Sequence, residues 1–258
     1  MNAVSRTGAL SLRFVEALGE SAVFAMKIVL NLFKPPFRLK LLLKELHKQG
    51  VLSLSIVCIS GLAVGMVLGL QGYIALVKVG STGFLGAWVG LALLRELGPV
   101  LTALLVTGRA GSATTAEIGT MVATEQLDGL RMMSIEPVHL VVVPKALAML
   151  IVMPLLASLF NVMGIFGGYL VGVSLMGLDH GIFMNSLDGA VVFSDDVVIG
   201  LIKSVFFGCL VGLISTWRGC TSKPASAGVS WATTSTVVIT SVSIFIFDYF
   251  LTALWGFA

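Results

Sequence analysis

The feature that most limits the fold of this chain is a series of apolar runs, each about as long as a membrane-crossing helix. Five runs lie at about 51–77, 84–107, 144–176, 197–217 and 228–256. A hydrocarbon core about 30 Å thick requires roughly 20 apolar residues in a helix, and the runs lack the alternating pattern of a β-barrel. The sequence therefore predicts an all-α integral membrane protein with five transmembrane helices.

Composition supports this class, because 57% of the 258 residues are hydrophobic and only 11% are charged, whereas soluble domains are about a quarter charged. We interpret 1–258 as a single domain, with a cytoplasmic or interfacial part at 1–50 and the helix bundle at 51–256. Apolar residues at helical spacing over 9–33 predict an N-terminal amphipathic helix in the membrane interface. A loosely attached surface helix is the alternative.

The distribution of Lys and Arg predicts the orientation in the membrane, because cytoplasmic segments are enriched in both. Basic residues gather before the first run, between the second and third runs, and between the fourth and fifth. The remaining connectors carry only Lys78 as a basic residue, and the later one is acidic. The N-terminus is therefore expected in the cytoplasm and the C-terminus on the opposite side.

The first run contains Gly61, Gly65 and Gly69, spaced four residues apart. On a helix this spacing strips one face of side chains, so that a neighbouring backbone can come close. Helix packing is the favoured interpretation of these glycines, and a groove that leaves room for lipid tails is the alternative.

The second run contains two adjacent ionisable residues, Arg95 and Glu96, in the string LLRELGPVLTALL. Such residues are costly inside a membrane and usually mark a functional site. Adjacent side chains on a helix point about 100° apart, and Asp248 in the fifth run is a candidate partner for Arg95. Pro99 disfavours a straight helix here. A lining for a head-group cavity and a purely structural role are equally open.

No catalytic motif is found in the sequence. It lacks a GxxxxGK[ST] phosphate loop, HExxH and GxSxG, and its cysteines and histidines show no metal-ligand spacing. We therefore predict no catalytic residue, metal site or cofactor in this chain, which leaves transport, binding or scaffolding. The polar segment 108–137 is expected to lie in the cytoplasm as a short helix that contacts a soluble partner, or as a turn that covers the bundle end.

Four strings resemble the MlaE (YrbE) family of permeases, in matching order over nearly the whole chain: GMVLGLQGY, LLRELGPVLTALL, GRAGSATTAEIGTMVATEQLDGL and SAGVSWATTSTVV. The resemblance implies a homodimer in the inner membrane of a Gram-negative bacterium, with a periplasmic C-terminus, within an ABC-type system for phospholipid transport that maintains outer-membrane lipid asymmetry. It implies as partners an MlaF-type ATPase that uses ATP and Mg, an MlaB-type STAS protein bound through the ATPase, and a hexamer of MlaD-type MCE lipid carriers. No nucleic acid is implied.

The resemblance also implies roles for particular residues. A phospholipid is expected between the permease subunits, in contact with Leu68, Tyr73, Leu76, Val79, Arg95 and Glu96. A coupling helix gripped by the ATPase is expected around 123–133, with Ala123, Thr124, Glu125, Gln126, Leu127, Asp128, Arg131, Met132 and Met133. The chain departs from its family where Val79 replaces a tyrosine and where Ser235 replaces an arginine of a relative.

The mechanism implied by the resemblance is that closure of the ATPases brings the coupling helices together, narrows the dimer cavity and expels lipid. Two alternatives belong to other functional classes. One is a membrane scaffold that anchors the carrier ring and the ATPase without transporting lipid. The other is an ion-coupled secondary transporter, which is disfavoured by the scarcity of membrane-embedded carboxylates and by the absence of duplicated halves in the sequence.

Overall fold

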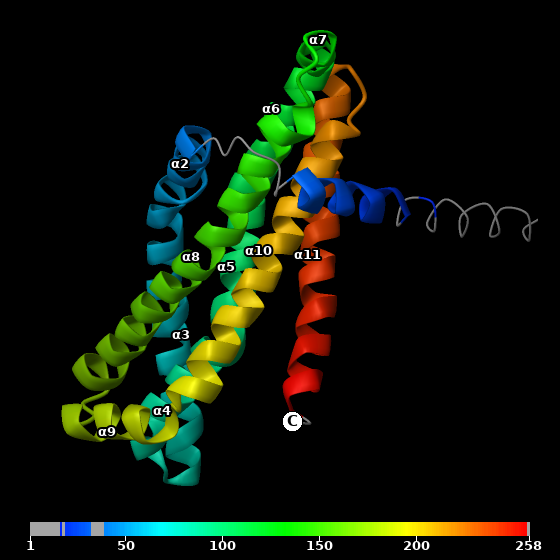
Figure 1. Ribbon diagram of the computed structural model, residues 1–258. Helices are drawn as coiled ribbons and strands as arrows, with labels where there is room; N and C mark the ends of the chain where they lie inside the picture. Colours follow the sequence, from blue (N-terminus) through cyan, green and yellow to red (C-terminus); the bar gives the residue numbers. More distant parts are fainter. Residues whose placement is uncertain (1–15, 17–18, 32–38, 257–258) are drawn as a thin grey trace, which may run out of the picture.

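The computed structural model describes residues 16, 19–31 and 39–256 (Figure 1). The described residues form helices and turns without a β-strand. Five of their helices are long and apolar enough to cross a membrane, which confirms the predicted all-α membrane architecture. Residues 19–31 of the expected interfacial helix are helical, and most of the rest of 9–33 lies outside the described residues.

The first two spans are each built from several helical segments that follow one another closely along the chain. The first covers Leu39–Val79 and the second Thr82–Ala123. The first comprises α2 (Leu39–Gln49), the 3-10 turn η1 (Val51–Ser53) and α3 (Leu54–Val79). The second comprises η2 (Thr82–Phe84), α4 (Leu85–Ala92), the π-turn η3 (Leu93–Leu97), α5 (Gly98–Val106), the π-turn η4 (Thr107–Gly111) and α6 (Ser112–Ala123).

The second span is longer than the sequence indicates. We expected it to end near residue 107, but residues 108–123 continue the helix. Polar side chains in this stretch find partners inside the bundle: Thr115 Oγ1 lies 3.0 Å from the Ser215 carbonyl oxygen and 3.1 Å from Thr236 Oγ1. Because these groups are satisfied internally, a segment too polar for a hydropathy criterion packs among the spans.

The remaining spans follow the prediction with small shifts at their ends. They comprise η5 (Val138–Val142), α8 (Val143–Tyr169) and η6 (Leu170–Leu175) for the third, η7 (Phe193–Val197) and α10 (Val198–Cys220) for the fourth, and α11 (Ser226–Gly256) for the fifth. The acidic connector after the third span contains the helix α9 (His180–Ala190), which packs against α4. The Asp179 side chain caps α9 by accepting the Ile182 N–H at 3.1 Å.

Helices α3 and α8 pack backbone to backbone along the three glycines of the first span. A Cβ atom added at Gly61 would lie 2.8 Å from the Phe160 carbonyl oxygen, and one at Gly69 would lie 3.0 Å from Gly168 Cα. At Gly65 the added atom would lie 2.6 Å from Gly164 Cα. The space beside these glycines is therefore filled by α8, and lipid tails have no room there in this conformation.

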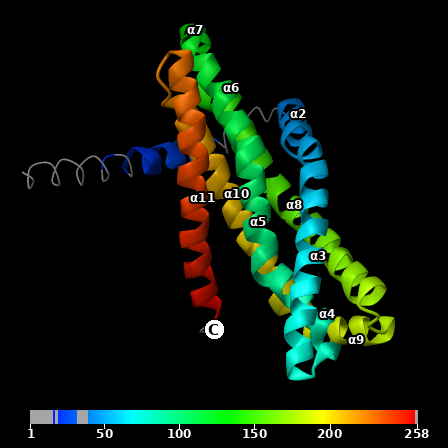
Figure 2. The ribbon, with the colours of Figure 1, turned by 180° about the vertical axis from the view of Figure 1, so that it is seen from behind.

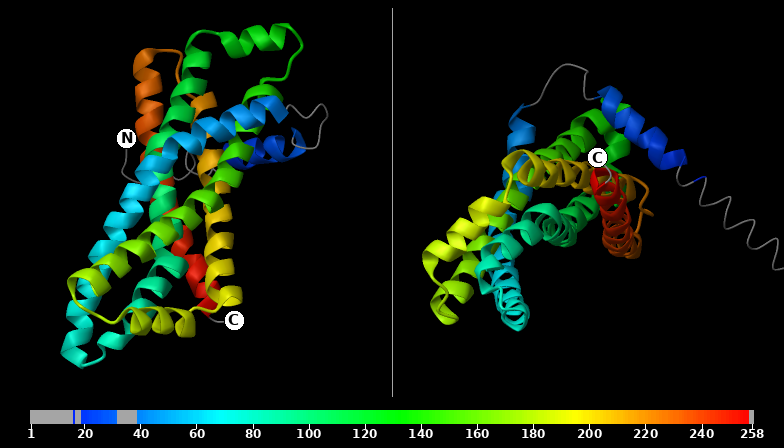
Figure 3. Two further views of the ribbon diagram at one scale, coloured as in Figure 1. Left: turned by 90° about the vertical axis from the view of Figure 1, so that its left-hand side faces the viewer. Right: turned by 90° about the horizontal axis from the view of Figure 1, so that it is seen from below.

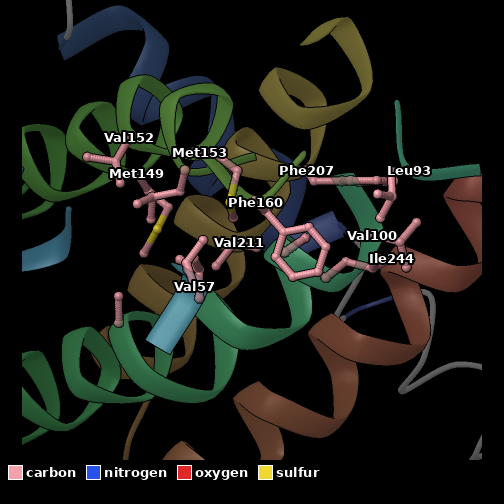
Figure 4. Packing of buried hydrophobic residues seen from close by; sticks show 14 of the residues in the cluster. Val57, Leu93, Val100, Met149, Val152, Met153, Phe160, Phe207, Val211 and Ile244 are labelled. Atoms are coloured by element: carbon pink, nitrogen blue, oxygen red, sulfur yellow. The ribbon is translucent and has the colours of Figure 1, made fainter. Parts of the chain in front are cut away.

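The centre of the bundle is a cluster of buried apolar side chains contributed by most spans (Figure 4). Phe160 of α8 and Phe207 of α10 are fully buried within it, together with Ile244 of α11. Outside this core, α3 and α11 expose large apolar side chains along much of their length, and both flank α5 (Figure 2). Membrane lipid or a second subunit must cover these faces.

Candidate functional site

The structure brings five charged residues of three spans together around the Arg95-Glu96 pair of the second span. Lys203 of α10 lies at the centre, with a side chain that is only 1% exposed. Its Nζ donates to Glu96 Oε2 at 2.7 Å and lies 3.3 Å from Asp248 Oδ1 of α11. Thr252 Oγ1 lies 2.8 Å from the same Nζ. A buried ammonium requires such oxygen partners, because an unpaired buried charge is strongly unfavourable.

The local backbone explains how Lys203 reaches this position. Arg95 lies in the π-turn η3, and Pro99 has no N–H to donate to the Arg95 carbonyl four residues earlier. Lys203 Nζ lies 3.1 Å from that carbonyl oxygen and donates to it. The proline thus leaves the Arg95 carbonyl oxygen available to the Lys203 side chain of another span. The sequence predicts only that Pro99 distorts the helix.

Arg95 pairs with Asp196 rather than with Asp248, so the candidate partner inferred from the sequence was wrong. Its Nε donates to Asp196 Oδ1. Asp196, in the π-turn η7, is fully buried, and its other oxygen accepts the Val192 N–H at 2.7 Å. The error has a geometric cause: Glu96 faces Lys203 and α11, and Arg95, turned away from it on the same helix, faces the start of the fourth span.

A cavity of 530 Å³ opens beside this cluster. It is lined by Arg95, Glu96, Ser194, Asp195, Val198, Ile199, Ile202, Lys203, Thr252 and Trp255. The Arg95 side chain is 53% exposed, and within the described chain its two terminal nitrogens have no partner. A guanidinium held by Nε with both terminal nitrogens free has the geometry for bidentate binding of a phosphate.

The other residues expected at a lipid site lie elsewhere in the chain. Leu68, Tyr73 and Leu76 are on α3, partly buried against the apolar core, and Val79 at the end of α3 is 76% exposed. None of them lines the charged cavity. One copy of the chain therefore brings together Arg95 and Glu96 but not the apolar residues of α3.

The segment expected to couple to a partner forms the short helix α7 (Gln126–Met132), which lies across the end of the bundle (Figure 3). It is shorter than 123–133, because Ala123 ends α6 and Glu125 adopts a left-handed conformation with φ of 56°. Leu127 packs into a small apolar cluster, whereas the Met132 side chain points outward and is 88% exposed. Helix α7 is thus fixed on one side and open on the other.

A second charged network connects the middle of α6 to two other spans. Lys145 of α8 lies 2.7 Å from Glu45 of α2 and 2.9 Å from Glu117 of α6, and Lys48 of α2 also pairs with Glu117. Because α7 directly follows α6, a force applied to α7 acts on a helix that is tied to the first and third spans.

Sequence reasoning missed Lys203 and Asp196. Lys203 is the only basic residue in the fourth apolar run, and the rule that pointed to Arg95 would have identified it. Asp196 was assigned to the acidic connector on the far side of the membrane, and no sequence pattern distinguishes it from the neighbouring Asp195.

Residues 42–254 match the model of a family described as Permease MlaE. The chain belongs to the MlaE permease family. The resemblance inferred from the sequence strings is thereby confirmed, over a range that covers nearly all of the five spans.

Relatives of this MlaE-family chain come from distant organisms. A protein of Haemophilus influenzae named intermembrane phospholipid transport system permease protein MlaE is 46% identical over 98% of this chain and 97% of its own. A probable ABC transporter permease protein of Rickettsia bellii is 35% identical over 99% and 98% of the two chains. The chloroplastic protein TRIGALACTOSYLDIACYLGLYCEROL 1 of Arabidopsis thaliana is 32% identical over 90% of this chain and 66% of its own.

Proposed function

We propose that this chain is the permease subunit of an ABC-type complex that moves glycerophospholipids between the inner and outer membranes and so maintains outer-membrane lipid asymmetry. Family membership and the name of the Haemophilus relative support this function. The observation that carries it is the half-exposed Arg95 guanidinium, anchored by Asp196 beside a cavity between the second, fourth and fifth spans.

The charged cluster suits a phosphate that must both bind and leave. Lys203 is neutralised by Glu96 and Asp248, so Arg95 is the cation that offers free donors to the cavity. Asp196 orients the guanidinium in advance and weakens its net charge. A site with one oriented, partly neutralised cation binds a phosphodiester without trapping it.

The acyl tails need an apolar wall, and we assign it to α3. Leu68, Tyr73, Leu76 and Val79 lie on a helix whose outer face is largely exposed, and α5 lies between α3 and α11 (Figures 2 and 3). A homodimer that covers these faces would place the apolar wall and the charged cluster around one lipid. Each buried methylene contributes about 0.8 kcal/mol, so the tails dominate affinity and head-group selectivity is weak.

The energy comes from a partner in this proposal. We assign α7 and its flanking residues 123–133 as the segment gripped by an ATPase that uses ATP and Mg, with a STAS-domain protein bound through that ATPase. A hexamer of MCE-domain carriers would receive lipid on the other side. The end with α7 then faces the cytoplasm, with the N-terminus cytoplasmic and the C-terminus periplasmic in the inner membrane, in agreement with the excess of Lys and Arg.

Movement would pass from α7 through α6 to the first and third spans. Glu117 of α6 is tied to Lys48 and Lys145, so rotation of α6 carries α2 and α8 with it. Closure of two ATPases would bring the two α7 helices together and narrow the cavity between the permease subunits, which expels the lipid. A disulfide crosslink that locks the subunits apart should therefore stop transfer.

The decisive experiment is ATP-dependent transfer of labelled phospholipid by the complete complex in vesicles, with Arg95→Gln in this chain. Loss of the bidentate contact should slow transfer at least about tenfold, because hydrogen bonds to charged groups contribute about 1.5–3 kcal/mol. Lys40→Gln, which removes an exposed lysine of α2, is the control for net charge and should transfer normally. Unchanged transfer by the assembled Arg95→Gln complex would refute the role of Arg95. Absence of transfer by the unmodified complex would favour a scaffold, and ATP-independent transport would favour a secondary transporter.

A further inference from the structure

A second polar pocket lies at the opposite end of the bundle from the charged cavity, where α10 ends and α11 begins. It has a volume of 360 Å³, and its lining includes Arg218, Ser222, Lys223, Gly228 and Trp231. Two of these residues are cationic and none is acidic. Within the described chain neither Arg218 nor Lys223 forms an ion pair, so the pocket carries uncompensated positive charge.

Arg218 is held in place by neutral groups. Its Nε and one terminal nitrogen donate to Ser235 Oγ at 3.0 Å and 2.6 Å. Its guanidinium also lies over the Trp231 ring, 4.7 Å from the ring centre. Ser235 of α11 thus orients the arginine of the neighbouring helix α10. The remaining guanidinium nitrogen is free for a ligand.

Two further observations indicate that this ligand is an anion. Ser222 belongs to the pocket lining and is only 9% exposed, and its hydroxyl, buried beside Gly119 of α6, has no hydrogen-bond partner within the described chain. The first bond into α11 is donated by the Val229 N–H to the Ala225 carbonyl, so the N–H groups of residues 226–228 have no backbone acceptor within the described chain. Unpaired N–H groups at a helix start, together with a buried hydroxyl and two cations, match the requirements of a phosphate.

The position of Trp231 indicates the source of that phosphate. Trp231 is 66% exposed near the start of α11, and Trp255 is partly exposed near its end. A helix rises 1.5 Å per residue, so the two rings are about 36 Å apart, slightly more than the hydrocarbon core of about 30 Å. Tryptophan gathers at both membrane interfaces. The pocket therefore lies at head-group depth in the leaflet on the α7 side.

We propose that this pocket binds the phosphate of a phospholipid head group in that leaflet, as a site separate from the transport cavity. Arg218 and Lys223 supply the charge, Ser222 and the first N–H groups of α11 supply donors, and Trp231 lies against the glycerol region. A lipid bound there connects the ends of α10 and α11 beside α6, on which both helices pack.

The test is native mass spectrometry of the full-length protein in detergent, titrated with phosphatidylglycerol. Lys223→Gln is the main variant, because the exposed Lys223 side chain has no ion pair or hydrogen bond in the described chain and its replacement leaves the fold intact. Lys44→Gln, an exposed lysine of α2, is the control. We expect Lys223→Gln to lower the affinity for one bound lipid about tenfold, and Lys44→Gln to leave that affinity unchanged. Ser222→Ala should lower the affinity for the same lipid several-fold without lowering the thermal stability of the protein.

Two further arms identify the ligand and separate this site from the transport cavity. Arg95→Gln should lower the affinity for a different bound lipid. The proposals for the transport cavity and for this pocket can therefore fail independently. Diacylglycerol, which lacks phosphate, should not occupy the site. If inorganic phosphate bound as tightly as the lipid, the assignment to a membrane lipid would be wrong. If both Lys223→Gln and Ser222→Ala bound phosphatidylglycerol like the unmodified protein, the pocket would not be a phosphate site.

Discussion

Of the three glycines of the first span, Gly65 should be the one whose substitution by alanine weakens the contact between α3 and α8 most. The added carbon would overlap the Gly164 carbonyl oxygen, its nearest neighbour, and would lie 2.6 Å from Gly164 Cα, whereas carbon atoms in contact are about 3.5–4.0 Å apart. The atom that it meets is backbone and cannot rotate away. The two helices must therefore separate locally by more than about 1 Å.

The cost follows from that separation. Overpacking of a tight interior costs about 1–3 kcal/mol, and more where backbone must shift, while alanine gains up to about 1 kcal/mol over glycine in helix propensity. We expect Gly65→Ala to lose about 2 kcal/mol net. Gly61→Ala and Gly69→Ala, with closest distances of 2.8 Å and 3.0 Å, should lose less.

The assay is thermal or denaturant unfolding of the purified protein in one detergent, with Gly108→Ala as the matched control. Gly108 lies in a π-turn of the second span with no atom within 4 Å of an added Cβ, so its substitution should be neutral or stabilising. The expected order of stability is Gly108→Ala highest and Gly65→Ala lowest. Equal stability of Gly65→Ala and Gly108→Ala would refute backbone packing along α3.

Two other predictions concern the charged cluster and α7. Lys203→Met should lower the free energy of unfolding by about 3–5 kcal/mol, because Glu96 and Asp248 lose a buried partner. The added change Asp248→Asn should recover part of this loss in the same unfolding assay. A fully stable Lys203→Met protein would contradict the pairing. Met132→Glu should leave unfolding unchanged, because the side chain is 88% exposed, while reducing copurification of the ATPase. Leu127→Asp should instead destabilise the protein, and normal ATPase binding by Met132→Glu would exclude that face of α7 as the contact.

The sequence predicts the spans well because their energetic basis is local. A run of apolar residues in lipid has no stable alternative to a helix, so the five spans follow from composition alone. The end of the second span was misjudged for the opposite reason. Thr115 is hydrogen-bonded to the fourth and fifth spans, and a hydropathy criterion does not include partners that are distant in sequence.

The charged site was only half predictable. The cost of Arg95 and Glu96 in an apolar run marks the location, but the choice between Asp196 and Asp248 depends on how three helices are rotated and shifted against each other. The glycines gave more information, since their four-residue spacing already specifies a close approach to a neighbouring helix. The identity of that neighbour, α8, requires the fold.

The measurement that tests the central claim most directly is an experimental map of the assembled complex in phospholipid nanodiscs. The account predicts phosphate density within hydrogen-bond distance of the two terminal nitrogens of Arg95, with Asp196 still bonded to its Nε and acyl density along α3. Lipid density absent from this cavity, or Arg95 terminal nitrogens fully occupied by protein groups in the complex, would contradict it.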